Sequence, residues 1–169
     1  MRLIIFGFLW LWMLFVPVSF SATTPFTTIA SSGQTIIKKS AGTFITQVVV
    51  KTHEVDIGKP SAERPDKIRT NCTYSRHPCS VVDYIDITVN GKPVVVNRSV
   101  FADLADLNRA EIKIDGHKAT LIIEAGDASE SYILKILFDK ERIIKREMFD
   151  GESDNSKLQE TNYYQVTLD

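Results

Sequence analysis

The sequence predicts a mainly β fold, an antiparallel meander that curls into a small barrel or sandwich and carries one short α-helix. Three observations support this. Runs rich in Val, Ile and Thr recur along the chain, as in residues 43–56 and 81–89, and such residues favour strands. Turn sequences such as Asn90-Gly91 separate these runs. The connections are also too short for the crossovers that join parallel strands.

The first 21 residues have the pattern of a secretory signal peptide. A short positive start, Met1-Arg2, precedes an almost wholly apolar stretch over residues 3–18, and Ser19 and Ser21 are small residues at the positions that a signal peptidase reads. The apolar stretch is about 16 residues long, shorter than the roughly 20 that a spanning helix needs. We therefore expect a periplasmic or secreted protein without a stable membrane anchor after cleavage.

The remaining chain is expected to form one domain. Residues 22–32 are rich in Thr and Ser with little apolar content and predict a flexible leader, so the single β-rich domain is placed at residues 33–169. The chain has 20 Lys and Arg against 21 Asp and Glu, a formal net charge of −1. This near balance lacks the basic surface typical of proteins that bind nucleic acid, which is not an expected partner.

The first half of the domain is expected to contain four strands and a long loop. Residues 58–71 contain prolines and alternating charges, and they form the loop that leads into the cysteines. An Asn-Gly pair between two β-branched runs, here Asn90-Gly91, predicts a hairpin. Pro93 just after it indicates an edge strand or a strand start. We expect these strands at residues 34–38, 43–56, 81–89 and 93–96.

A short α-helix is predicted after this hairpin. Ser99 is a plausible N-cap, and Val100, Leu104 and Leu107 recur at the spacing of one helix face. The helix is expected to end near Asn108.

The second half of the domain is expected to be a meander. Residues 111–115 alternate between apolar and charged side chains, the pattern of a half-solvated strand. Asp115-Gly116 turns the chain into the next strand, and residues 126–131 and 150–156 are polar loops. We expect these strands at residues 111–115, 118–124, 132–138, 141–149 and 161–168.

Cys72 and Cys79 are the two cysteines of the chain. In an exported protein they are expected to form a disulfide that closes a small loop. A metal-binding pair and free thiols are the alternatives. The chain has no second cysteine pair and no suitably spaced histidine pair, so we expect neither a metal nor another cofactor.

Two loops contain candidate binding residues. The first is the cysteine loop, where Tyr74, Arg76 and His77 are candidates because Tyr and Arg are enriched at binding hot spots and a disulfide restricts the loop. The second is the polar loop over residues 126–131, with Asp127 and Ser129 as candidates. The structural alternatives are a covalent clip for the first loop and a plain hairpin loop for the second.

No local motif predicts catalysis. His53-Glu54 begins like a zinc-protease motif, but Ile57 stands where the second histidine should be. Neither a Gly-x-Ser-x-Gly elbow nor a Gly-rich phosphate loop is present, so we assign no catalytic residue. A site assembled only in three dimensions remains an alternative. Asn71 and Asn97 match the N-glycosylation pattern, which matters only in a eukaryotic source.

From Cys72 onward, the chain resembles small exported proteins of Gram-negative bacteria that have no assigned function. The resemblance lies in the cysteine loop and in residues 89–93, 101–106 and 126–132. It implies a periplasmic location and carries no catalytic residues. The sequence thus predicts a non-enzymatic binding module for a protein or envelope component, for example a protective factor against a wall-degrading enzyme. A small hydrolase and a structural or assembly subunit are the alternatives.

Overall fold

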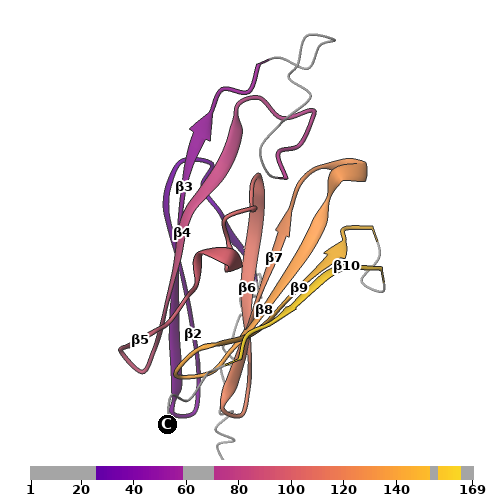
Figure 1. The fold of residues 1–169 in the computed structure, drawn as a ribbon. Coiled ribbons are helices and arrows are strands. Elements are labelled where there is room, and N and C mark those ends of the chain that lie inside the picture. Colours follow the sequence, from indigo (N-terminus) through magenta and orange to yellow (C-terminus); the bar gives the residue numbers. More distant parts are fainter. Residues whose placement is uncertain (1–25, 59–70, 153–155, 165–169) are drawn as a thin grey trace, which may run out of the picture.

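The computed structural model is a sandwich of two antiparallel sheets and not a closed barrel (Figure 1). It describes residues 26–58, 71–152 and 156–164. One sheet has six strands in the order β1-β6-β7-β8-β9-β10, which are β1 Thr27–Thr28, β6 Leu107–Asp115, β7 Lys118–Ala125, β8 Tyr132–Phe138, β9 Ile143–Asp150 and β10 Lys157–Asn162. The other has four strands in the order β2-β3-β4-β5, which are β2 Gly33–Ala41, β3 Phe44–Val55, β4 Cys79–Val89 and β5 Lys92–Val94. The mainly β prediction is therefore confirmed.

The strands follow the alternation of the sequence. In β7 and β8, every second side chain is buried and the intervening ones are half-buried, as expected for strands with one face on a core. The hairpin between β4 and β5 turns at Asn90 and Gly91, which have φ angles of 52° and 76°. Both fall in the left-handed region that a two-residue hairpin of this kind requires.

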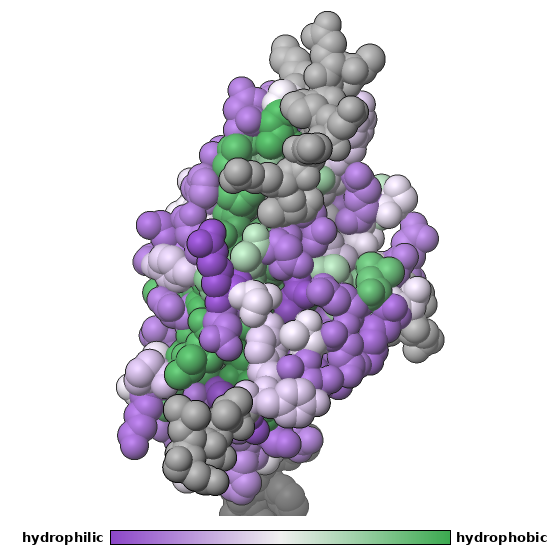
Figure 2. Space-filling view, viewed as in Figure 1, coloured by the Kyte–Doolittle hydropathy of each residue, from purple (hydrophilic) through white to green (hydrophobic). Residues whose placement is uncertain are grey.

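The core lies between the two sheets and is built from aliphatic side chains. The four-stranded sheet contributes Val48, Val50, Ile85 and Ile87, and the six-stranded sheet contributes Leu121, Ile123, Leu134 and Ile136. Figure 2 shows that hydrophilic side chains cover most of the visible surface, apart from a hydrophobic band over β3 and β4. Within the residues that the structure describes, no helix has the length and apolar character needed to cross a bilayer.

The predicted α-helix near residue 100 is wrong. The structure has a 3-10 turn, η1, at Arg98–Val100, followed by a segment that is not helical, and Asp106 has a φ of 51°. The side chains of Val100, Leu104 and Leu107 are buried. Their spacing therefore indicated buried positions correctly, although the segment is not a helix. We call residues 95–106 the connector, because they link the four-stranded sheet to β6.

The two ends of the domain also differ from the prediction. Thr27–Thr28 pairs with β6 and Ile29 is buried in the core, so the sheet begins before residue 33, inside the segment expected to be a leader. The last described strand is Lys157–Asn162 and not residues 161–168, and Tyr164 is strongly exposed. The predicted signal peptide, residues 59–70 of the predicted long loop and residues 165–168 of the predicted last strand lie outside the described residues.

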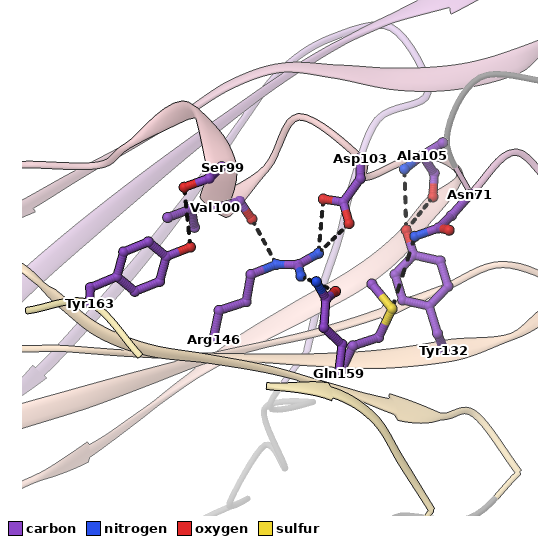
Figure 3. A network of polar contacts seen from close by, with 10 residues as sticks. Asn71, Ser99, Val100, Asp103, Ala105, Tyr132, Arg146, Gln159 and Tyr163 are labelled. Atoms are coloured by element: carbon purple, nitrogen blue, oxygen red, sulfur yellow. Dashed lines mark hydrogen bonds and ion pairs between the residues drawn. The ribbon is translucent and has the colours of Figure 1, made fainter. Parts of the chain in front are cut away.

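A buried arginine attaches the connector to the six-stranded sheet (Figure 3). Arg146 of β9 has a side chain only 2% exposed. Its Nε donates to the Val100 carbonyl at 3.1 Å, and its Nη2 donates to both oxygens of Asp103 at 2.9 and 2.7 Å. Its Nη1 donates to Gln159 Oε1 of β10 at 2.6 Å. The guanidinium thus joins three segments and leaves none of its nitrogens unused.

Tyr132 provides a second attachment for the same connector. Its hydroxyl donates to the Ala105 carbonyl at 2.7 Å and accepts the Ala105 N–H at 3.2 Å (Figure 3). Burial raises the pKa of Tyr132 well above its ordinary value, so the hydroxyl stays protonated. These contacts hold the connector in a non-helical path, because the Val100 carbonyl and both peptide groups of Ala105 are paired with side chains of β8 and β9.

Replacing Arg146 with Leu is expected to destabilise the fold by about 2 kcal/mol, because the Val100 carbonyl loses its buried donor, while water can reach the half-exposed Asp103 carboxylate. The free energy of unfolding, from urea denaturation, measures this. The control is Arg109→Leu, which breaks the exposed pair with Glu124 and should cost much less. Equal effects of the two substitutions would contradict the role given to Arg146.

Candidate functional site

The two candidate loops lie side by side at one end of the sandwich, at the top of Figure 1. The cysteine loop, Cys72 to Cys79, precedes β4, and the 126–131 loop joins β7 to β8. Sequence reasoning treated the two loops as separate candidates. The structure joins them through several hydrogen bonds, so we describe them together as the loop end.

The predicted disulfide between Cys72 and Cys79 is confirmed. Their Cα atoms are 5.7 Å apart, within the usual range for a disulfide. The sulfurs and the Asp106 carboxylate are within 4.8 Å of one another. Because the sulfurs are bonded to each other, they do not provide the two thiolates that a metal site would need.

Asp106 holds the base of the cysteine loop. Its Oδ2 accepts the Thr73 N–H at 2.7 Å, and its Oδ1 accepts the Ser80 N–H at 2.9 Å. These are the residues that follow the two cysteines in sequence. Asp106 is 1% exposed, and its own N–H donates to the Ser80 carbonyl at 2.6 Å. One carboxylate therefore fixes both ends of the disulfide-closed loop, through hydrogen bonds that its charge strengthens.

Arg76 crosses from the cysteine loop to the six-stranded sheet. Its guanidinium donates to the carbonyls of Asp106 and Gly126, each at 3.3 Å, and to the side-chain oxygen of Asn108. Asn108 in turn donates from Nδ2 to the Gly126 carbonyl at 2.8 Å. Arg76 therefore positions the loop, and contact between its side chain and a partner stays a prediction.

The tips of the two loops are also joined. The Tyr74 N–H donates to Glu130 Oε2 at 2.6 Å, and the Ser75 hydroxyl donates to Asp127 Oδ2 at 3.2 Å. The 126–131 loop is tightly folded, since a Cβ on Gly126 would lie 2.2 Å from the Glu130 carbonyl oxygen. Gly126 also has a φ of 75°, so both space and conformation favour glycine.

A groove of about 320 Å³ lies beside these loops. It runs between the start of the cysteine loop, the 126–131 loop and the edge strand β10. Its lining is mixed, with polar and apolar side chains from the loops and from β9 and β10. The residues that line it include Asn71, Ser129, Glu130, Met148 and Leu158. Leu158 is 59% exposed and Tyr74, on the neighbouring loop, is 47% exposed.

The histidines of the described region do not face a hydroxyl nucleophile in a hydrogen bond. His77 lies 3.9 Å from Asp56 at the loop end, and His53 lies 2.6 Å from Asp83 on the four-stranded sheet. The Ser75 hydroxyl, which is close to His77 in sequence, donates to Asp127. The side chains at the loop end are therefore arranged to hold one another in place.

Sequence reasoning missed Asp106, Glu130 and Tyr132 as determinants of the loop end. The prediction of a helix over residues 99–108 concealed Asp106, because an acidic residue is ordinary on an exposed helix face. The available signal was a lone acid within the apolar stretch Leu104-Ala105-Asp106-Leu107, since a charge in such a stretch must be paired if it is buried.

Comparison with protein-family models, with curated proteins and with solved structures finds no match to this chain.

Replacing Asp106 with Ala is expected to reduce the free energy of unfolding by about 3 kcal/mol, because two buried N–H groups lose their acceptor. Asp106→Asn keeps one acceptor oxygen and should cost about half as much. Hydrogen exchange at the Thr73 and Ser80 amides should accelerate in both variants.

The matched control is Asp127→Ala, which removes an exposed carboxylate from the same loop end. It should leave exchange at these two amides nearly unchanged. Unaltered exchange in Asp106→Ala would show that the carboxylate does not hold the loop.

Proposed function

We propose that this protein is an exported, non-enzymatic binding module that recognises another protein or a cell-envelope component through its loop end. The observation that supports this most directly is the placement of Tyr74. Its side chain is half exposed, while the backbone beneath it is fixed by the disulfide, by Asp106 and by Glu130.

An aromatic side chain on a fixed loop is suited to binding. Tyr provides a large contact area and a polar hydroxyl, which is why it is enriched at interface hot spots. A loop that is already ordered loses less conformational entropy on association, and more of the contact energy appears as affinity. The adjoining groove, with Leu158 and Ser129 on its lining, offers apolar and polar contacts next to Tyr74.

Export is part of the proposal and rests on two features. The chain begins with the pattern of a signal peptide, and the disulfide is weakly consistent with an oxidising compartment. A partner would then belong to the same compartment. A protective factor that blocks a wall-degrading enzyme is a concrete version, in which Tyr74 contacts the surface of that enzyme.

An assembly subunit is the second candidate, favoured by the edge of the six-stranded sheet. β10 is the last strand of that sheet, and most of its residues are exposed. An open edge can pair with a strand of another chain. Size-exclusion chromatography separates the two candidates, because assembly through β10 predicts oligomers of the purified protein and binding through Tyr74 does not require them.

Substituting Tyr74 with Ala should weaken capture of a partner from envelope extract at least tenfold, the loss expected for a hot-spot aromatic. The pull-down uses the natively purified protein and quantifies each captured species. Tyr164→Ala is the matched control, because Tyr164 is an exposed tyrosine that lies beside Val95 and Glu141 and not at the loop end. It should leave capture unchanged.

Arg76→Ala is a second variant with a different expectation. It should weaken capture and also accelerate hydrogen exchange in the cysteine loop, since Arg76 holds that loop on the sheet. If every captured species binds Tyr74→Ala as well as the unaltered protein, the loop end is not the recognition surface.

A further inference from the structure

The two sheets end in four edge strands, and β2 is the longest and most regular of them. β1 has two residues, and β5 has three residues and contains Pro93. β10 has six residues and a register shift where it pairs with β9. β2 has nine residues, all of which pair with β3 in one uninterrupted register. Shortness, proline and bulges protect a sheet edge from pairing with another chain, and β2 has none of these features.

The outer edge of β2 presents backbone groups that can pair with another strand. In the described residues, β3 is the one strand that is hydrogen-bonded to β2. The N–H and C=O groups directed away from β3 form a row along the strand, and such a row is a template for a further strand. The charged residues of β2, Lys38 and Lys39, both lie in its second half. The first half, residues 33–37, therefore has no charge that opposes pairing.

Ile36 gives this edge an apolar side chain that the single chain leaves uncovered. Ile36 is 52% exposed, whereas Thr35 and Ile37 on either side of it are buried. Because neighbouring residues of a strand face opposite sides, Ile36 lies on the outer face of the four-stranded sheet, beside Val49 of β3. A strand added to β2 would cover part of Ile36 as well as pair its backbone groups.

A second copy of β2 fits this edge in an antiparallel arrangement centred on Ile36. Ile36 then lies opposite Ile36 of the second copy, on the same face, and the two form an apolar cross-strand pair. In the same register, Gln34 lies opposite Lys38, and Gly33 lies opposite Lys39. No two like charges are directly opposite, an arrangement that would be unfavourable. The pairing is self-complementary, as a two-fold interface requires.

The charges around this edge favour the antiparallel arrangement. It places Lys39 of the second copy on the face of the sheet that contains Glu54 of β3, because both residues alternate in step with buried neighbours. In the described part of the chain, Glu54 accepts a hydrogen bond from Ser31 at 2.7 Å and has no ion pair. On the other face, the Lys51 ammonium lies over the Tyr84 ring of β4, away from β2. A parallel arrangement would instead bring the lysines of the two copies together.

We propose that two copies of this chain associate through β2, paired antiparallel and centred on Ile36, so that their four-stranded sheets become one continuous sheet. The proposal names an edge other than β10 and does not depend on the function proposed for the loop end. It assigns a partner, a second copy of the same chain, to the exposed side of β2.

Sedimentation velocity of the purified protein at increasing concentration tests the proposal. We expect a monomer–dimer equilibrium with a dissociation constant on the order of 10 μM. Ile36→Lys places two like charges opposite each other at the centre of the interface, and it should raise that constant at least about tenfold. Ile45→Lys is the matched control, because Ile45 is a 59% exposed isoleucine of β3, an inner strand of the same sheet. It should leave the dimer unchanged.

Mixing two variants tests the register itself. Ile36→Lys and Ile36→Glu should each be monomeric, and an equimolar mixture should form a heterodimer, because opposite charges then face each other at the centre. Both variants should keep the circular dichroism of the unaltered protein, since Ile36 is exposed and outside the core.

Two further variants separate this interface from the other surfaces. Leu158→Lys, on β10, and Tyr74→Ala, in the cysteine loop, should dimerise like the unaltered protein. The proposal would be overturned by an unaltered protein that stays monomeric, by a dimer that survives Ile36→Lys, or by a mixture of the two Ile36 variants that stays monomeric. A dimer lost in Leu158→Lys would assign the interface to β10 instead.

Discussion

The buried carboxylate of Asp106 is the constraint on which the rest of the loop end depends. A buried charge is costly unless hydrogen bonds replace its water, and here the N–H groups next to both disulfide-bonded cysteines provide that replacement. The same residue places its carbonyl where Arg76 and the Gly126 N–H can reach it. The cysteine loop, the connector and the start of the 126–131 loop therefore meet at Asp106, whose backbone is in the left-handed region.

The connector explains why two polar side chains of the six-stranded sheet, Arg146 and Tyr132, are buried. A four-stranded sheet cannot cover all of a six-stranded one, and η1 with the residues after it provides cover over β9. An irregular segment in a covering layer needs partners for its peptide groups. Arg146 supplies a partner for the Val100 carbonyl, and Tyr132 supplies partners for the N–H and the carbonyl of Ala105. Asp106, at the end of the connector, uses its carboxylate on the cysteine loop.

Strands inside the sheets could be predicted closely because each one carries its own signal, whereas the edge strand β1 was not predicted and β10 lies before most of the predicted last strand. β8 was expected at residues 132–138 and is found at Tyr132–Phe138, since its alternate residues face one core. The connector could not be predicted, because its apolar spacing is compatible with a helix and its side-chain partners in β8 and β9 lie 27 to 46 residues away in sequence. The disulfide followed from the cysteine count and the predicted export signal, but the contact between Tyr74 and Glu130 depends on a pairing 56 residues apart.

At the loop end, most substitutions that could change binding of a partner also change the stability of the loop. This limits which residues can be substituted to test function alone. The polar groups of Asp106, Arg76 and Asn108 make hydrogen bonds to one another and to the backbone. Substituting any of them changes the shape of the loop together with any surface that a partner would contact. Tyr74 is different, because its N–H holds the loop while much of its side chain lies in solvent. Truncating that side chain keeps the backbone hydrogen bond to Glu130, and unchanged hydrogen exchange in the cysteine loop would then assign a loss of binding to contact and not to the position of the loop.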